Sequence, residues 1–244
     1  MISKTCALSS IAAIGRRAPA LGETVLLEKL IERYPYLYHM AEAGTWPSIQ
    51  QRGLLSTTAA LDALGVSGAR RQALEGMHRP TMLALKPGAP DDIVLRDQRP
   101  MPPSRLAQAL PTGLTTEQWY RLINSKVFFW VSEERLGRLL RSYGADEHDV
   151  LRVDTASLLS AHFDRTWLCH MNSGNTLPIP HWRDENTFKR IPDYPVNRVG
   201  RPVKDVVELV VDYSVPDIAT HVVDVTRVKG DTKLGVIWRA DHDL

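Results

Sequence analysis

The stretch Val206-Val207-Glu208-Leu209-Val210-Val211 places one carboxylate inside an otherwise apolar run. Valine-rich runs of this length favour a β-strand, and an apolar strand is typical of the centre of a sheet. In an alternating strand Glu208 shares a face with Val206 and Val210, where a charge is costly unless water or a partner compensates it. Two interpretations therefore have equal weight. One is an edge strand with Glu208 on a solvated face, and the other is a carboxylate held rigidly at a cleft.

Other apolar and amphipathic segments surround this strand along the chain. The pattern predicts further strands at residues 36–40, 54–57, 81–86, 93–96, 127–131, 150–153 and 219–228, the last of these closing the fold. It predicts helices at residues 23–33, 45–51, 58–76, 104–110, 115–124 and 133–143. The strands are short and do not alternate regularly with helices, so a doubly wound parallel sheet is disfavoured. We predict an α+β fold with a mixed or mostly antiparallel sheet.

The bulk composition indicates one globular domain. With 244 residues, 43% of them hydrophobic, the chain can form one sizeable core. We expect an N-terminal arm at residues 1–22, followed by a single domain at 23–244. The net charge of +2 excludes a uniformly basic nucleic-acid coat protein.

Cysteine usage and hydropathy bear on the compartment. Cys6 and Cys169 have no CxxC spacing, which is typical of reduced thiols, so we predict a cytoplasmic protein. No apolar run approaches the roughly 18 residues of a membrane span. Arg16 and Arg17 follow the apolar N-terminal segment instead of preceding it, which argues against a secretory signal.

Common catalytic and phosphate-binding motifs are missing from the sequence. There is no GxGxxG, no GxxxxGK[ST], no HExxH and no GxSxG. No two histidines have the i,i+4 spacing of a helical metal site, so we expect no metal.

Two further polar residues follow predicted strands. His39 ends the aromatic run at residues 36–40, and Arg135 lies a few residues after the strand at 127–131. Taken alone, His39 is more often a hydrogen-bonded structural histidine, and Arg135 a solvated helix residue. An arginine near a strand end can also bind a phosphate through two parallel hydrogen bonds.

Three short segments resemble the ADP-ribosyltransferase superfamily, in particular its DarT-like branch, which acts on DNA. Residues 37–57 (LYHMAEAGTWPSIQQRGLLST) resemble the start of that fold. Phe128-Phe129-Trp130 followed by Arg135 is similar to its second landmark, although the intervening loop is longer here. Glu208 to Val211, followed by Val215-Pro216, is similar to its last landmark. The middle of the chain, residues 58–126, and the stretch 170–188 show no correspondence.

The resemblance implies a split mixed or antiparallel sheet with flanking helices, and NAD as the co-substrate. It implies a catalytic domain that cleaves the bond between nicotinamide and ribose through an oxocarbenium-like transition state. Glu208 would bind the nicotinamide ribose and stabilise the developing positive charge. His39 would bind the adenosine ribose and Arg135 the pyrophosphate, and these three residues form the expected catalytic set. The expected cofactor-binding residues are Tyr38, His39, Ser56, Phe129, Trp130 and Arg135.

The long loop at residues 172–202 is the candidate region for the acceptor. Basic residues between 183 and 204 are interleaved with Trp182, Phe188 and Tyr194, a combination that suits a nucleic-acid strand. The alternative is a solvated loop whose aromatic residues anchor in the core. Weaker substrate candidates are His170, Asn172, Arg183 and Arg190.

The resemblance predicts transfer of ADP-ribose to a macromolecule, with DNA or RNA favoured over protein. Such enzymes are often toxins or defence effectors, so an antitoxin or immunity partner is possible. Two alternatives remain open: an RNA 2′-phosphotransferase of the same architecture, and a binding module without enzymatic activity. The enzyme hypothesis requires His39, Arg135 and Glu208 to line one cleft.

Overall fold

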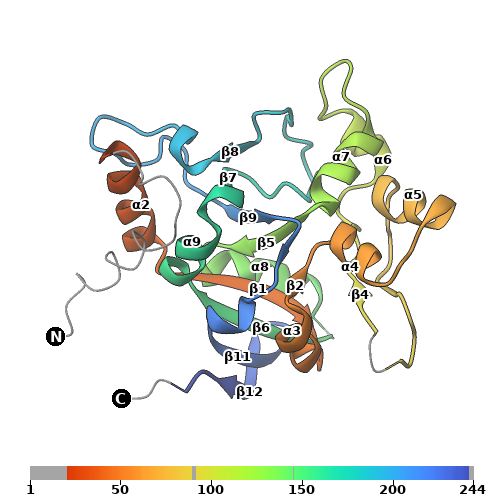
Figure 1. The fold of residues 1–244 in the computed structure, drawn as a ribbon. Helices are drawn as coiled ribbons and strands as arrows, with labels where there is room; N and C mark the ends of the chain where they lie inside the picture. The colour runs from red at the N-terminus through yellow and green to blue at the C-terminus, as the bar shows by residue number, and fades with distance from the viewer. Residues whose placement is uncertain (1–20, 90–91, 145, 242–244) are drawn as a thin grey trace.

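A computed structural model describes residues 21–89, 92–144 and 146–241 (Figure 1). Its main feature is a sheet in the order β12-β11-β6-β1-β5-β9-β7-β8, in which all neighbouring strands are antiparallel. The bounds are β1 (Tyr36–Glu42), β5 (Lys126–Trp130), β6 (Glu147–Asp154), β7 (Thr166–Cys169), β8 (Phe188–Arg190), β9 (Glu208–Asp212), β11 (Val222–Lys229) and β12 (Thr232–Arg239). Two short antiparallel pairs lie outside this sheet: β2 (Leu54–Leu55) with β10 (Ser214–Val215), and β3 (Leu83–Ala84) with β4 (Val94–Leu95).

Helices pack on both faces of the sheet (Figure 1). On one face α2 (Leu21–Arg33), α3 (Trp46–Arg52) and α9 (Thr155–His162) cover the largest apolar cluster. On the other face α6 (Pro103–Ala107) and α7 (Thr116–Asn124) pack against β5, β7, β8 and β9, whereas α8 (Glu133–Ser142) packs against β1, β5, β6 and β11. The α+β fold with a large antiparallel sheet, predicted from the short, irregularly spaced strands, is therefore confirmed.

The sheet is weakest at its centre, between β1 and β5. β1 pairs with β6 from Tyr36 to Glu42, and β5 pairs with β9 from Lys126 to Trp130. By contrast, β1 and β5 are joined at the single pair Tyr38–Trp130. Beyond that pair, toward Glu42 and Lys126, the two strands leave a gap in the ladder. We refer to this gap as the split.

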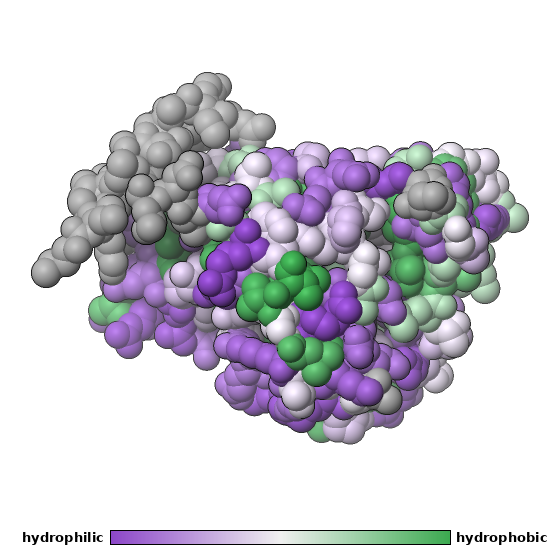
Figure 2. All heavy atoms as spheres, turned by 90° about the horizontal axis from the view of Figure 1, so that it is seen from below, coloured by the Kyte–Doolittle hydropathy of each residue, from purple (hydrophilic) through white to green (hydrophobic). Residues whose placement is uncertain are grey.

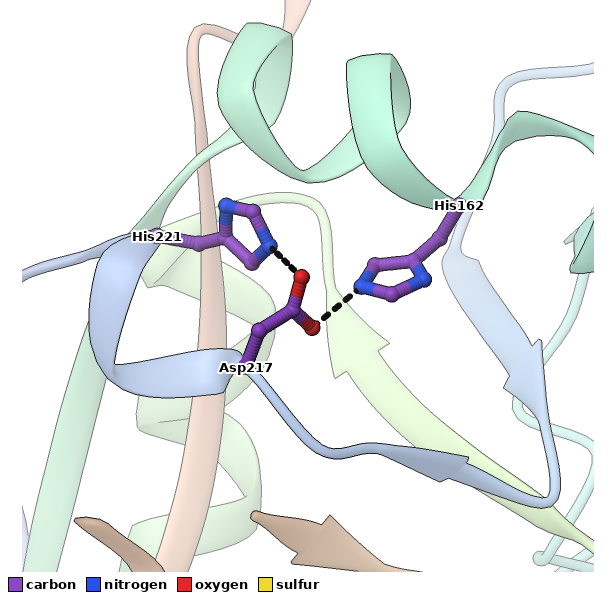
Figure 3. Close-up of side chains that lie close together, drawn as sticks. All are labelled: His162, Asp217 and His221. Carbon is purple, nitrogen blue, oxygen red and sulfur yellow. Dashed lines mark hydrogen bonds and ion pairs between the residues drawn. The ribbon is translucent and has the colours of Figure 1, made fainter. Parts of the chain in front are cut away.

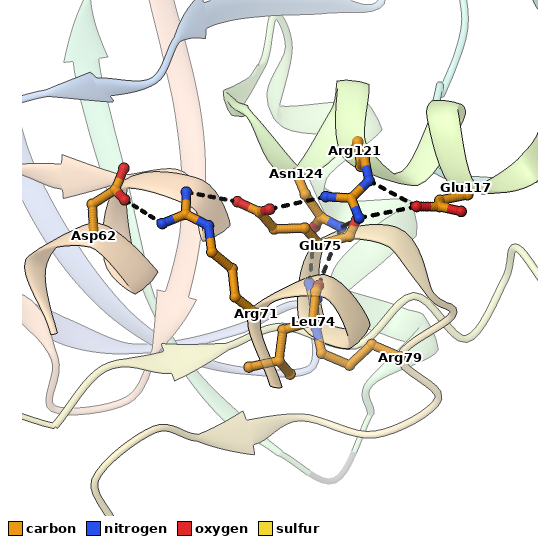
Figure 4. A network of polar contacts seen from close by, with 8 residues as sticks. All are labelled: Asp62, Arg71, Leu74, Glu75, Arg79, Glu117, Arg121 and Asn124. Carbon is orange, nitrogen blue, oxygen red and sulfur yellow. Dashed lines mark hydrogen bonds and ion pairs between the residues drawn. The ribbon is translucent and has the colours of Figure 1, made fainter. Parts of the chain in front are cut away.

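Residues 57–124 form a lobe beside the split that contains α4 (Thr57–Ala63) and α5 (Gly68–Gly76). A polar network joins its helices (Figure 4). Glu75 forms ion pairs of 3.1 Å with both Arg71 and Arg121. Arg79 donates to Asn124 Oδ1 (3.2 Å), and Asn124 Nδ2 donates to the Glu75 carbonyl (2.8 Å). These bonds fix α5 against α7 and so hold the wall of the split in place.

β12 is an edge strand with exposed apolar side chains. Leu234, Val236 and Ile237 are each about half exposed, and apolar side chains stand among hydrophilic ones on the face seen in Figure 2. Lys233 and Arg239 flank them on the same strand. Charged residues at a sheet edge disfavour pairing with another chain.

Several element predictions were wrong. The helix expected at residues 58–76 is two helices, because Gly65 and Gly68 adopt positive φ angles of 64° and 63° between them. Strand β11 does not close the fold, since β12 follows it. The loop at 172–202 contains β8 and the 3₁₀ turn η3 (Ile191–Asp193). Glu208 begins β9 instead of lying in its middle.

Other differences concern the chain ends and the first cap. Residues 1–20 of the expected N-terminal arm lie outside the described residues, and α2 begins at Leu21. Thr45, the first residue of the helix predicted at 45–51, lies at the N-cap position of α3, which begins at Trp46, and its hydroxyl donates to the Glu42 carbonyl without capping the helix. None of the described helices is long and apolar enough to cross a membrane.

Candidate functional site

A cavity of about 340 Å³ occupies the split. Residues of β1 and β5 form two of its sides, and α3, α7 and α8 contribute others. Because α3 covers one face of the sheet and α7 and α8 the other, the cavity reaches both faces at the point where the ladder is interrupted. Its size lies at the lower end of the range for small-molecule sites.

His39 lies on the β1 side of the cavity. Its Nδ1 is 2.8 Å from the carbonyl oxygen of Phe128 on β5, so the side chain bridges the split where ladder bonds are missing. Nδ1 must donate to that carbonyl, which leaves Nε2 as an acceptor in the neutral ring. Burial lowers the pKa of His39 to about 4, and the positive charge of Arg96 adds to the effect. His39 is therefore neutral at physiological pH, with Nε2 available to a hydroxyl donor.

Glu208 lies on the opposite side, at the start of β9. It is only 4% exposed, and both carboxylate oxygens accept hydrogen bonds from the backbone N–H of Ser173, at 3.3 and 3.1 Å. Burial raises the pKa of Glu208 to about 7, although the Ser173 bonds and the charges of Arg183 and Arg135 oppose the rise. A buried carboxyl with a raised pKa at a cavity wall is a frequent feature of functional sites.

The loop that contacts Glu208 is ordered by Arg183. This side chain is fully buried, and its guanidinium donates to the carbonyls of Ser173, Asn172, Asn175 and His181. Arg183, expected to contact the acceptor, therefore has no solvent-accessible surface. Its hydrogen bonds instead hold the turn that presents the Ser173 N–H to Glu208. We regard it as a positioning residue.

The structure brings several of the other predicted residues to this cavity. Ser56, Phe129, Trp130 and Asn172 all contribute to the lining. Ser56 caps α4 by accepting from Ala59 N at 3.1 Å, and its hydroxyl can still donate.

The remaining predicted residues lie elsewhere. Arg135 is not among the lining residues, although its charge acts on Glu208. Tyr38 lines a second cavity, of about 710 Å³, between α8 and the β11–β12 hairpin. Arg190 stacks on Trp167, with its guanidinium carbon 3.9 Å from the ring centroid, at the β8 edge of the sheet. His170 is half-buried and does not line the cavity. The cavity therefore joins two of the three residues in the expected catalytic set.

Sequence reasoning missed the contribution of residues 57–124. Arg79, Arg96 and Asn124 from this lobe line the cavity, as do Arg52 and Lys126. One signal was present: Asn124 lies four residues after the buried Tyr120, so the apolar face of α7 carries an amide. A polar group at such a position needs a partner, which Arg79 provides.

Only one group of described residues has ligand atoms close enough to hold a metal ion, namely His162, Asp217 and His221 (Figure 3). His162 Nδ1 accepts a hydrogen bond from Arg165 Nη2 (2.8 Å), so the proton of the neutral ring lies on Nε2, 2.6 Å from Asp217 Oδ1. His221 Nε2 is 3.3 Å from the other carboxylate oxygen. A metal would need the lone pair of His162 Nε2 and would lie near the Arg165 guanidinium. The geometry is that of hydrogen-bonded side chains that hold α9 against the turn η4 (Ile218–Thr220).

Comparison with known proteins gives one match. A family model covers residues 35–222, which is more than three quarters of the chain. The chain belongs to the DUF7002 family. This family is described as one of unknown function. No curated protein and no solved structure matches the chain. Of the residues that the structure describes, all those that line the cavity in the split lie within the DUF7002 range, whereas β12 lies outside it.

Proposed function

We propose that this DUF7002 protein is an NAD-dependent ADP-ribosyltransferase that acts on a macromolecular acceptor. One observation carries the proposal: His39 and the buried carboxyl of Glu208 line a single cavity at the split between β1 and β5. Arg135 does not line that cavity, so the requirement that all three expected catalytic residues meet in one cleft is not fulfilled, and the proposal rests on His39 and Glu208 alone. The resemblance to the ADP-ribosyltransferase superfamily implies this pair of residues and a split sheet with NAD in the opening. The support therefore comes from two independent sources, sequence landmarks and geometry.

Glu208 has the properties that the reaction needs. Breaking the bond between nicotinamide and C1′ of ribose leaves positive charge on the sugar, and a nearby carboxylate stabilises that charge. The acceptor then forms a bond to C1′ and loses a proton, while nicotinamide departs with the bonding electron pair. Strand β9 is paired on both sides, with β5 and β7, so the carboxyl has a fixed position.

The pKa of Glu208 sets the expected pH dependence. Because burial raises this pKa to about 7 in the free protein, only part of the population is ionised at neutral pH. The positively charged nicotinamide ring would favour the ionised form on binding. We therefore expect kcat/KM for NAD to rise with pH up to about 7 and then level off, since this ratio reports groups of the free enzyme.

His39 and the aromatic residues of β5 complete the proposed NAD site. The free Nε2 of neutral His39 can accept a hydrogen bond from a ribose hydroxyl. Phe129 is 1% exposed and contacts the His39 ring edge-on, with centroids 5.8 Å apart, so it holds the imidazole in place. The half-buried Trp130 offers a flat apolar surface to the nicotinamide ring.

Nucleic acid remains the favoured acceptor in this proposal. The loop at residues 172–202 offers fewer exposed aromatic side chains for base stacking than its sequence indicates. Of its three aromatic residues, Phe188 and Tyr194 are buried and anchor the loop, whereas Trp182 is 58% exposed. Trp182 is thus the aromatic side chain able to stack on a base. A role as a toxin or defence effector with an immunity partner follows from the family resemblance alone.

The test is nicotinamide release from NAD, with and without single-stranded DNA, RNA or protein acceptors. We expect Glu208→Gln to lower turnover by at least about 100-fold, since electrostatic stabilisation of a transition state contributes on that scale. The matched control is Glu134→Gln, because this side chain is 74% exposed on α8. Release of nicotinamide at the wild-type rate by the Glu208 variant would remove the residue from the reaction.

One observation favours a second candidate, the RNA 2′-phosphotransferase. That reaction depends on several basic residues in the cleft, and the cavity is lined by Arg52, Arg79, Arg96 and Lys126. Lys126 is paired with Asp212, and Arg79 donates to backbone and side-chain oxygens of the lobe, which leaves Arg52 and Arg96 for a ligand. Loss of phosphate from a 2′-phosphorylated RNA in the presence of NAD, without ADP-ribosylation of unphosphorylated nucleic acid, would favour this candidate.

A further inference from the structure

Arg96 is a cavity-lining cation whose partner among the described residues is an aromatic ring, that of Tyr143, and not a hydrogen-bonded carboxylate. It lines the cavity, and both Nη1 and Nη2 are shielded from solvent without a hydrogen bond in the described parts of the chain. Neither of these nitrogens is therefore hydrogen-bonded to a carboxylate of the described residues. A buried guanidinium without an anion is costly, so such an arrangement is expected where a ligand supplies the anion.

The position of this guanidinium is fixed before any ligand binds. Its carbon lies 4.7 Å from the centroid of the Tyr143 ring, and the Tyr143 hydroxyl donates to Asp97 at 3.0 Å. The backbone carbonyl of Arg96 accepts a bond of 2.7 Å from Arg79 Nε. Because ring, carboxylate and backbone are all held, the guanidinium is presented as a preorganised planar donor.

Titratable groups on β1 and β6, together with Asp97, face Arg96. The positive charge of Arg96 lowers the pKa of His39 and Glu42 on β1 and of His148 on β6. Asp97 lies next to it in sequence and is engaged by Tyr143 and Arg99. Glu42 is a candidate counter-ion, since the charge of Arg96 acts on its carboxylate, but its Oε2 is not hydrogen-bonded to Arg96 and is likewise buried without a partner among the described residues.

These unpaired atoms together specify the ligand chemistry. Arg96 offers two parallel N–H donors, which match the oxygens of a phosphoryl group. Glu42 Oε2 offers an acceptor to a hydroxyl group in the same cavity. We propose that Arg96 and Glu42 form a sugar-phosphate subsite, in which Arg96 binds the phosphoryl group and Glu42 binds a sugar hydroxyl. In naming NAD as the source of the phosphate, this inference rests on the proposed function.

The competing explanation is an internal ion pair. A small movement could bring Arg96 onto Glu42, and the pair would then be purely structural. Under that explanation neither residue would discriminate between a nucleotide and a nucleoside, and neutralising both residues together would restore whatever stability one replacement loses.

The experiment is a calorimetric titration of the full chain with AMP, adenosine, ADP-ribose and inorganic pyrophosphate. In the wild type we expect AMP to bind at least about tenfold more tightly than adenosine, because hydrogen bonds to charged groups contribute on that scale. Arg96→Gln should abolish the difference, and Arg96→Lys should retain part of it. The matched control is Arg99→Gln, since Arg99 also lies over Tyr143 but is 58% exposed and does not line the cavity.

The outcomes separate this inference from the proposed function. Equal binding of AMP and adenosine by the wild type, or an unchanged preference in Arg96→Gln, overturns the subsite. If nicotinamide release then persists with an unchanged KM, the proposed function stands without the subsite. A phosphate preference that depends on Arg96 in a protein that never cleaves NAD supports the subsite and removes the proposed function. Titration with a 2′-phosphorylated RNA, compared with ADP-ribose, identifies which molecule carries the phosphate.

Discussion

Replacing Glu208 with glutamine should stabilise the fold at alkaline pH while removing the proposed activity. A glutamate in the unfolded chain titrates near 4.5, and burial raises the pKa of Glu208 in the folded protein to about 7. Between these values the folded state binds more protons than the unfolded state. Stability is therefore lost as pH rises through this range, and the loss is complete above about pH 7.

The size of the effect follows from the pKa values. One pKa unit corresponds to about 1.4 kcal/mol, so the ionised carboxylate costs the folded state about 3 kcal/mol above pH 7. Glutamine carries no charge and can still accept one hydrogen bond from Ser173 N–H, but that bond is weaker than one to a carboxylate. The net gain in free energy of unfolding should be about 2 kcal/mol at pH 8.

Thermal unfolding at two pH values measures this gain. For a chain of this length 2 kcal/mol corresponds to a rise in Tm of about 4 to 8 °C at pH 8. At pH 5 the wild-type carboxyl is protonated in the folded state, so the difference in Tm should shrink toward zero. The control is Glu75→Gln, because Glu75 is also buried but has two arginine partners, as Figure 4 shows. That variant should be less stable than the wild type at both pH values.

The reasoning about Glu208 fails if its glutamine variant is destabilised equally at pH 5 and pH 8. Such a result would mean that the carboxylate is compensated in the folded state, as Glu75 is. The same variant in the nicotinamide-release assay then shows whether stability and turnover move in opposite directions, which is expected where a fold retains a costly group for its chemistry.

Three further predictions concern the scaffold. Gly53→Ala should lower the free energy of unfolding, measured by urea titration, by about 3 kcal/mol, because φ is 81° and an added Cβ would lie 2.4 Å from Pro216 Cα. The control is Gly65→Ala, which has a φ of 64° and open space around it and should cost only about 1 kcal/mol. Arg79→Met should cost about 3 kcal/mol, because it removes the hydrogen bonds of 2.7 and 2.8 Å to the carbonyls of Arg96 and Leu74. A wild-type urea midpoint would contradict this. His162→Phe should lower the free energy of unfolding by about 1 to 2 kcal/mol through loss of the hydrogen bond to Asp217. Added Zn²⁺ should leave the Tm of the wild type unchanged. A rise in Tm with Zn²⁺ that is lost in His162→Phe would show that this group binds metal.

The class of the fold could be predicted from the sequence because it depends on local patterns. β5 and β9 are mainly apolar runs with most residues buried, and α7 has a complete capping box at Thr115 and Gln118. Helix α9 was not predicted, since its apolar residues do not form a stripe along one side. β12 was missed because its apolar residues are exposed and show no inward and outward alternation.

The candidate site could be predicted only where its residues occur in short segments. His39 and Glu208 are polar groups beside apolar strands, and they line one cavity because β1, β5 and β9 are neighbours in the sheet. Arg96 lies more than 30 residues from any landmark, in a lobe held by the pairing of α5 with α7. Its position depends on long-range contacts such as that of Arg79 with Asn124, which no local pattern encodes.

The split between β1 and β5 also has a mechanical consequence. Each half of the sheet has a continuous ladder, β1 with β6 and β5 with β9, whereas one backbone pair and the hydrogen bond of His39 to Phe128 join β1 to β5 within the sheet. Compliance is therefore concentrated along a single line through the molecule. A ligand that contacts both β1 and β9 would act as a cross-brace, and amide hydrogen exchange should slow on both sides of that line together when it binds.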